Sequence, residues 1–554
     1  MPKRLWVSVA MLAVGGGLLA TAQLARAVGG SSSFTKGGIF RVGTTFPSVQ
    51  VDPQLAYITT AWWLEYATAA KLYNYPDRRG PAGLRLVPEV ASKFAVSNGG
   101  TTYTFTIRKG FKFSDGMPVT AKNFKHAINR VASHDLASPG AGFIIDQRGT
   151  NIVGAQEVNR GEATDVGGVT AKGNKLIIQL TSPDSAFLSK ITMPFFQATS
   201  TKLPLDTEIV NVTDITTIPS AGPYAFSRND VDTLTSLREN PFWRAGPGRM
   251  RPRNLAGVDV QWNLNGIWLF QQVESGELDL GPLSVADYEW VARKYGVNKT
   301  RFWTKPTNCT GFLPLNMAND LFKGNPKLRR AVAYAIDRRA YTAQVGPYAG
   351  QPWSHLLNPS VPGWRNVNPY PLNRPNLAKA RKLAAGHFRD GKITVYYRSS
   401  GTVNPAQAQI VRQDLINLGF EPNNITMKGF PGGDIYTAMG RRGTDADIGV
   451  SMGWCSDYPD PSNWFDSLLR GGYNFSRMDS PRWDRKMDAA ASLVGPARLK
   501  AYGQLDIDIM RQVAPMAAER TYNNRYFFSD RVNPKSLVYQ GVYSDWSIPA
   551  LALK

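Results

Sequence analysis

The stretch that decides the fold covers residues 392–461 and reads KITVYYRSSGTVNPAQAQIVRQDLINLGFEPNNITMKGFPGGDIYTAMGRRGTDADIGVSMGWCSDYPDP. Short apolar runs rich in β-branched and aromatic residues alternate in it with longer amphipathic segments. We expect strands and helices in the order 392–397, 406–418, 424–429, 434–442 and 446–452. Strands and helices that alternate in this way form parallel βαβ units with right-handed crossovers. Ligands bind beyond the carboxyl ends of such strands, which is where GWCSDYPDP (453–461) is expected to lie.

Two other segments carry clear local signals. TTYTFTI (101–107) alternates apolar and polar residues, which predicts a half-buried strand, and Thr120 is the expected N-cap of the helix that follows. Asn325 as a cap and Pro326 at the first helical position predict a helix that continues through LRRAVAYAIDRR (328–339). These elements belong to the scaffold.

The size and charge of the chain limit the classes of protein that it can be. Its 554 residues exceed one ordinary core, so two or more lobes are expected, and 43% hydrophobic residues indicate a folded globular protein. The formal net charge of +22 favours attraction to anionic surfaces or partners. Because the basic residues occur as scattered doublets such as Arg78-Arg79, we expect a solvated basic surface and no nucleic-acid partner.

The first 27 residues have the pattern of a signal peptide. Lys3 and Arg4 precede the apolar run LWVSVAMLAVGGGLLA, and Ala25-Arg26-Ala27 fits a small-x-small cleavage site. An uncleaved anchor is the alternative. No cysteine follows the run, so lipid attachment is not supported, and no later segment has about 18 consecutive apolar residues. We therefore expect a soluble extracytoplasmic protein, in the periplasm or at the outer face of the cell membrane.

One motif suggests an enzyme. Residues 449–453 (GVSMG) match G-x-S-x-G directly after a predicted strand, the nucleophile elbow of the α/β hydrolases, with Ser451 as the nucleophile. That fold requires a helix after the serine and a histidine later in the chain. Pro459 and Pro461 oppose the helix, and the last histidine is His387. A serine hydrolase is therefore a remote alternative, and we do not expect an enzyme.

Metal and nucleotide chemistry find no support in the motifs. The four histidines show no ligand spacing, and the two cysteines lie far apart in the chain. No Gly-rich loop ends in the Lys-Ser/Thr pair that holds phosphates. We expect no metal site and no cofactor, and the chemistry that remains is binding.

Several motifs resemble one protein family. They are LVPEVASKFAVSNGGTTYTFTIRKGFKFSDGMPVTAKNFKHAI (86–128), SAGPY (220–224), NPFW (240–243), RRAVAYAIDR (329–338) and GWCSDYPDP. In this order they resemble the family 5 extracytoplasmic solute-binding proteins, the oligopeptide-, dipeptide- and nickel-binding components of ABC transporters. The resemblance covers nearly the whole chain from about residue 38. It implies an α/β, periplasmic-binding-protein-like fold (type II, cluster C) with two lobes, a hinge and an extra subdomain.

The resemblance also implies a division of the chain. After the signal peptide, the first lobe would use residues 28–59 and 211–305, with 60–210 as the extra subdomain and 525–554 as a returning segment. The second lobe would span 306–524. Such lobes close over a ligand by a hinge motion that is absorbed at a few connecting segments.

The ligand residues are also implied by the resemblance. In peptide-binding members, a Trp-Cys-small-Asp turn meets the amino end of the peptide, and Trp454-Cys455-Ser456-Asp457 matches it. Asp457 would hold the ammonium group, Trp454 would form an apolar wall, and the backbone of Cys455 would pair with the ligand. Weaker matches are Tyr57 and Thr59 for the opposite side of the peptide and Phe430 for a second aromatic wall. Taken without the family, Asp457 could be an ordinary turn residue and Trp454 a core residue.

Two positions depart from the family pattern. Some peptide binders carry an arginine that meets the ligand carboxylate where this chain has Ser451, and Gly140 stands where an aromatic contact is expected. Both changes leave open how the carboxyl end of a ligand is held.

Cys309 and Cys455 fall at positions that are bridged in some members of the family. A disulfide is expected between them, and two buried free thiols are the alternative.

The function implied by the resemblance is that of a monomeric receptor. It would capture peptides between its lobes and deliver them to a membrane permease, with ATP hydrolysed by a separate subunit. A receptor for a nickel chelate, a sugar or another small solute is the alternative on the same scaffold.

Overall fold

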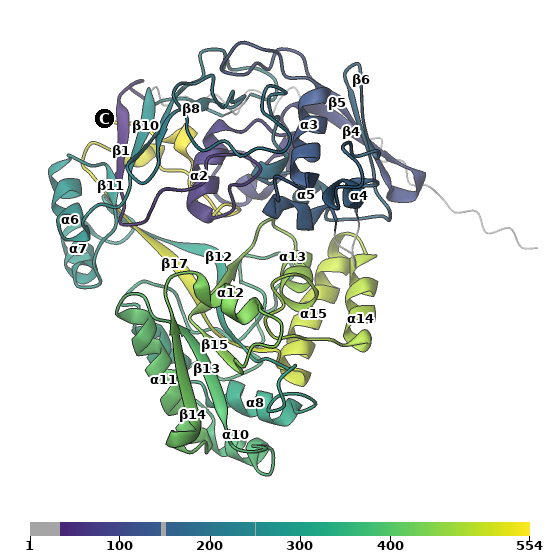
Figure 1. Ribbon diagram of the computed structural model, residues 1–554. Helices are drawn as coiled ribbons and strands as arrows, with labels where there is room; N and C mark the ends of the chain where they lie inside the picture. Colours follow the sequence, from purple (N-terminus) through teal and green to yellow (C-terminus); the bar gives the residue numbers. More distant parts are fainter. Residues whose placement is uncertain (1–33, 146–150, 250) are drawn as a thin grey trace, which may run out of the picture.

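The two longest strands, β12 (Phe302–Pro314) and β17 (Met516–Phe528), pair antiparallel and connect the two lobes of the molecule. In the computed structural model, which describes residues 34–145, 151–249 and 251–554, both strands run from one lobe into the other (Figure 1). Phe528 belongs to the core of the first lobe and Ala517 to the core of the second. The architecture is the predicted two-lobed α/β fold. The expected signal peptide, residues 1–27, lies outside the described residues.

One mixed sheet of eight strands spans the lobes in the order β16-β12-β17-β11-β1-β10-β9-β8. Its other strands are β16 (Met452–Cys455), β11 (Leu280–Gly281), β1 (Ile39–Gly43), β10 (Gly257–Gln261), β9 (Leu234–Glu239) and β8 (Tyr224–Asp230). In the first lobe α2 (Thr59–Thr68), α6 (Gly266–Ser275) and α7 (Asp287–Tyr295) pack around it. Strand β16 forms one edge of this sheet.

A smaller antiparallel sheet lies at the outer part of the first lobe (Figure 1). Its strands, in sheet order, are β4 (Ala91–Ser97), β5 (Thr102–Ile107), β7 (Lys175–Gln179) and β6 (Val169–Lys172). The predicted strand is β5, and α3 (Ala121–Ala132) starts at Thr120, whose backbone N–H donates to the Asn123 side chain at 2.8 Å. Both local predictions are confirmed. The short helices α4 (Ala155–Asn159) and α5 (Phe187–Lys190) complete this region.

The second lobe contains the parallel sheet predicted from residues 392–452. Its order is β14-β13-β15, with β13 (Ile393–Arg398) between β14 (Ile425–Phe430) and β15 (Ile448–Val450). Helix α11 (Val403–Leu418) starts three residues earlier than expected and α12 (Asp434–Gly440) ends earlier. The remaining helices are α8 (Pro326–Ala335), α9 (Arg338–Ala343), α10 (Leu377–Ala384), α13 (Ser462–Phe465), α14 (Pro481–Ala491) and α15 (Gly495–Gln512).

One sequence prediction is wrong in detail, and one strand was not predicted. The helix after Asn325 does not continue through 328–339, because Ile336 is extended (ψ 123°) and Asp337 caps a new helix by accepting from the Ala340 N–H at 2.9 Å. GWCSDYPDP follows the carboxyl end of β15, as expected, but its first three residues belong to the unpredicted strand β16. Strand β15 ends at Val450, Ser451 takes a positive φ of 61°, and the chain then enters β16 of the large sheet.

In the described ranges, no helix combines the length and apolarity that crossing a bilayer requires.

Candidate functional site

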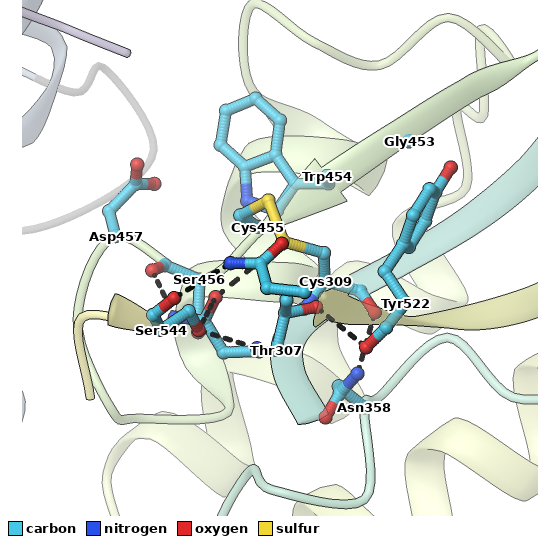
Figure 2. Close-up of a disulfide and its surroundings, with 12 residues drawn as sticks. Thr307, Cys309, Asn358, Gly453, Trp454, Cys455, Ser456, Asp457, Tyr522 and Ser544 are labelled. Atoms are coloured by element: carbon cyan, nitrogen blue, oxygen red, sulfur yellow. Dashed lines mark hydrogen bonds between the residues drawn. A yellow bond between two sulfur atoms is a disulfide. The ribbon is translucent and has the colours of Figure 1, made fainter. Parts of the chain in front are cut away.

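The edge strand β16 is held from one side. It pairs antiparallel with β12, with Cys455 opposite Cys309 and Gly453 opposite Gly311. Cys309 and Cys455 form a disulfide that closes a separation of 146 residues. The bond fixes the end of β16 at the point where the chain turns toward Asp457 (Figure 2).

Among the described residues, no group on the other side of β16 is hydrogen-bonded to the backbone of Cys455. At Gly453, the backbone N–H donates to the Tyr436 hydroxyl at 3.0 Å and the carbonyl accepts from it at 3.2 Å. Alternate residues of an antiparallel strand direct their backbone groups to the same side. The N–H and C=O of Cys455 therefore point to this side too, while Ser456 bonds back to Asn308 at 3.3 Å. A ligand in extended conformation can pair with Cys455 from this edge.

Asp457 follows the edge strand β16, and the side chains that hydrogen-bond to it carry no charge. Its backbone N–H donates to Asn463 Oδ1 at 3.0 Å, and Asn463 Nδ2 donates to its carboxylate at 2.7 Å. Burial raises the pKa of Asp457 to about 7, against the opposing effects of Asn463 and Tyr57. Among the described residues no lysine, arginine or histidine forms an ion pair with it. Figure 2 shows the carboxylate turned away from the disulfide.

Tyr57, a residue of the first lobe, lies beside the carboxyl of Asp457. Burial, and after it the neighbouring carboxylate of Asp457, raise the pKa of Tyr57 well above its ordinary value. Tyr473 of the second lobe lies beside both, and its ring is 4.5 Å from that of Trp454. Trp454 is half-buried, packs against the core of the second lobe and donates to Asn463 at 3.4 Å, so its role as an apolar wall stays a prediction.

A cavity of about 330 Å³ opens between the lobes next to these tyrosines. Tyr57 and Phe143 line it from the first lobe, and Tyr458, Tyr473 and Arg470 line it from the second. Residues of both lobes thus line a partly open space that borders Tyr57 and Tyr473, the two tyrosines beside Asp457.

The structure places the other predicted site residues elsewhere. Thr59 is exposed at the first residue of α2. Phe430 ends β14 opposite Arg398, with its ring 4.6 Å from that of Tyr396, so it does not lie with the Asp457 group. Their roles in ligand binding stay predictions. Gly140 packs under Phe195, where an added Cβ would lie 2.8 Å from the ring, which explains why no aromatic residue stands there.

Ser451 does not have the surroundings of a hydrolytic nucleophile. Its hydroxyl donates to Gln407 Oε1 at 3.1 Å, and strand β16 follows it instead of a helix. Of the histidines, His355 pairs with Asp506 at 2.8 Å, and His126 and His134 bond backbone carbonyls. Within the described ranges no histidine or carboxylate is hydrogen-bonded to Ser451, and these residues contain no cluster of three or more metal-ligating side chains.

Sequence reasoning missed Asn463, Tyr473 and Tyr436. Tyr436 lies in α12, Asn463 lies in α13, and Tyr473 follows the helical segment that ends at Arg470. No motif links them with Asp457 or Gly453, and only the fold brings them together around β16.

Comparison with known proteins agrees with this picture. The profile of the "Bacterial extracellular solute-binding proteins, family 5 Middle" matches residues 85–476. "Probable di/tripeptide-binding protein 5" of Pseudomonas aeruginosa is 26% identical over 430 residues, 72% of this chain and 75% of that protein. "Heme-binding protein A" of Haemophilus influenzae is 22% identical over 80% of this chain and 81% of its own length. The solved structure of "Clavulanic acid biosynthesis oligopeptide binding protein 2" superposes with a TM-score of 0.81 at 22% identity, covering 94% of this chain and 96% of that one.

Proposed function

We propose that this chain, which belongs to family 5 of the bacterial extracellular solute-binding proteins, captures a peptide between its two lobes and presents it to the permease of an ABC importer. The similarity to a di/tripeptide-binding protein supports the ligand class. Similarity to a heme-binding protein shows that membership alone does not choose the ligand. The choice therefore rests on the site.

The observation that carries the proposal is Asp457, a carboxyl without a cationic partner at the end of a free strand edge. A buried carboxylate is costly unless a cation or several donors compensate it. An ammonium group supplies both charge and three donors. The two functions that a peptide's amino end requires, a charge partner and backbone pairing at Cys455, thus occur side by side.

A non-peptide solute fits these features less well. Heme carries carboxylates, which Asp457 would repel. A sugar or a nickel chelate has no peptide backbone that could pair with the strand edge at Cys455. We therefore place these ligands second.

The division of the chain forms part of the proposal. The first lobe comprises residues 28–305 and 525–554 with 60–210 as a subdomain, and the second comprises 306–524. Support comes from the two separate large cores and from β12 and β17, which cross between them. We further propose export by the signal peptide and a monomeric receptor outside the cytoplasm.

The test is calorimetric titration of tri-alanine into the wild-type protein and into Asp457→Asn. A charge-assisted hydrogen bond contributes about 1.5 to 3 kcal/mol, so binding should weaken by about tenfold or more. Asp479→Asn, an exposed acid of the same lobe, is the matched control and should bind as wild type does. Unchanged affinity in Asp457→Asn removes the assigned role. Absence of peptide binding in the wild type, with another mass found by native mass spectrometry of the purified protein, rejects the peptide itself.

A further inference from the structure

A second pocket, of about 580 Å³, lies on the first lobe and shares no lining residue with the cavity between the lobes. Four cations line this basic pocket, Arg79, Lys299, Lys305 and Lys535. In the parts of the chain that the structure describes, no acidic residue lines it and no carboxylate forms an ion pair with any of the four. A concave surface that carries one sign of charge attracts ions of the opposite sign.

Arg79 is fixed in this pocket by neutral groups. Its Nη2 donates to the backbone carbonyls of Lys535 and Leu537, each at 2.9 Å, and its Nε donates to the Leu537 carbonyl at 3.2 Å. These carbonyls orient the guanidinium and leave its net charge in place. Within the described ranges no group accepts a hydrogen bond from Nη1, so this nitrogen is available to a ligand.

Aromatic side chains form the wall of the basic pocket. The rings of Tyr539 and Trp303 lie 5.3 and 5.7 Å from the ring of Trp546, and all three pack in the core of the first lobe. The Tyr539 hydroxyl donates to the Pro306 carbonyl at 2.7 Å. Trp546 is buried, and its indole N–H has no acceptor among the described residues. The wall is therefore tightly packed and contains an unsatisfied donor.

Lys305 lies between this wall and the other cations. Its Nζ is 5.2 Å from the ring centre of Trp303 and 5.8 Å from that of Trp546. The aromatic faces attract the ammonium group, but partial burial and then the charge of Arg79 lower the pKa of Lys305. An anion bound beside Lys305 and Arg79 would relieve this repulsion.

We propose that the basic pocket binds the phosphate group of an organic phosphate ester. A phosphate monoester carries about −1.5 to −2 charges and three acceptor oxygens at neutral pH, which matches several cations better than one carboxylate does. The guanidinium of Arg79 offers planar donors to the oxygens, and the lysines act as mobile point charges. This inference goes beyond peptide capture and does not depend on it, because the pocket is built from residues 79–80, 299–305 and 534–546 alone.

The same phosphate chemistry occurs in soluble esters and in phospholipid head groups. Binding to a bilayer surface by aromatic residues requires rings that reach into the interface. Trp546 is buried, and Trp303 and Tyr539 are half-buried. A soluble ester therefore fits the pocket better, and the lipid is tested separately.

The experiment is calorimetric titration of phenyl phosphate at low ionic strength, where charge interactions are least screened. We expect saturable binding of one molecule, and Lys299→Gln/Lys535→Gln should weaken it about tenfold or more. Both lysines are exposed, so this variant should fold. The matched control is Lys122→Gln/Lys327→Gln, which removes the same charge from exposed positions elsewhere and should bind as wild type does. Equal weakening in both double variants would overturn the inference.

A second ligand tests the phosphate itself. Benzoate has the same ring and a single charge, so it should bind more weakly than phenyl phosphate. Equal affinity for the two compounds rejects a phosphate site.

Two further outcomes separate the sources and the sites. Sedimentation with vesicles of phosphatidylglycerol and phosphatidylcholine in equal parts, lost in Lys299→Gln/Lys535→Gln, would assign the phosphate to a lipid head group. Absence of binding to both phenyl phosphate and the vesicles overturns the inference and leaves the peptide proposal untouched. Asp457→Asn should bind phenyl phosphate as wild type does, and weakened binding there would place the phosphate between the lobes and reject the basic pocket.

Discussion

At the scale of single residues, Asp457 combines two properties that rarely occur together. It is ionisable near neutral pH, and among the described residues the side chains that hydrogen-bond to its carboxyl are an amide and a tyrosine. A carboxyl in this state exchanges a proton for a cation. Binding of an ammonium group and binding of a proton therefore compete at one atom pair.

This competition predicts how affinity depends on pH. The pKa of Asp457 in the ligand-free protein is about 7, so below pH 7 the carboxyl is protonated and must lose its proton before it binds an ammonium group. Tri-alanine should bind most tightly at pH 7 to 7.5 and progressively more weakly down to pH 5. The other groups that face Asp457, Tyr57 and Tyr473, have raised pKa values and stay neutral across this range.

Calorimetric titration between pH 5 and 7.5 at constant ionic strength measures the effect. Asp457→Asn should show a flat profile over the same range. Affinity that rises as the pH is lowered would contradict the assignment of the carboxylate as the ammonium partner.

The sequence marks candidate site residues only where a motif contains them, and their roles in binding stay predictions. Trp454, Cys455 and Asp457 are consecutive or nearly so, and the resemblance marked them. Tyr436 lies in α12, before β16 in the chain, and its hydroxyl reaches the backbone of Gly453 only in the folded protein. No local pattern in the sequence predicts this contact.

At the scale of elements, β16 depends on its neighbour. It has four residues and one paired side, so the backbone bonds to β12 and the disulfide hold it in place. Short edge strands are weakly ordered on their own. The rigidity of β16 therefore depends on its pairing with β12 and on the disulfide.

Removal of the disulfide should weaken both stability and binding. Closing a loop of 146 residues stabilises by about 4 to 5 kcal/mol in the chain-entropy estimate, and measured gains are often smaller. We expect the double variant Cys309→Ser/Cys455→Ser to unfold at a lower temperature and to bind tri-alanine more weakly. Scanning calorimetry and titration check this, and a reducing agent should change the wild type but not the variant. Equal stability of the two proteins would show that backbone pairing alone fixes β16.

Elements with local periodicity were predicted well. The alternation in residues 101–107 and the strands of the 392–452 segment appear as β5, β13, β14 and β15. The pairing of β16 with β12 was missed because the partner lies 146 residues away. The break at Ile336 was missed because the apolar period continues through it, while Asp337 offers a new cap.

At the scale of the whole molecule, ionisable groups are buried in both lobes. Burial raises the pKa of Glu65 and Glu519 to about 8 and that of Asp414, Asp457 and Asp545 to about 7. Each of these carboxyls binds a proton more tightly in the folded than in the unfolded chain. Their contribution to stability is present at acidic pH and is lost as the pH rises through these values.

The ligand-free protein should therefore have a higher unfolding temperature at pH 5 than at pH 7. Burial lowers the pKa of His126, so this one group makes the folded protein less stable at acidic pH and opposes the trend. The pKa of Lys71 is lowered to about 7, so Lys71 changes the stability only above that pH. Scanning calorimetry at pH 5, 6 and 7 measures the slope. Asp457→Asn should reduce it, and an unfolding temperature that rises over this range would contradict the burial of these charges.

The covalent tie between β12 and β16 has a consequence for the life of the protein. Thiols stay reduced in a cytosolic glutathione pool, so a newly made chain there would carry β16 without the disulfide that attaches it to β12. The disulfide forms only in an oxidising compartment. Under the proposed export, the attachment of β16 to β12 would therefore be completed only after the chain has left the cytosol.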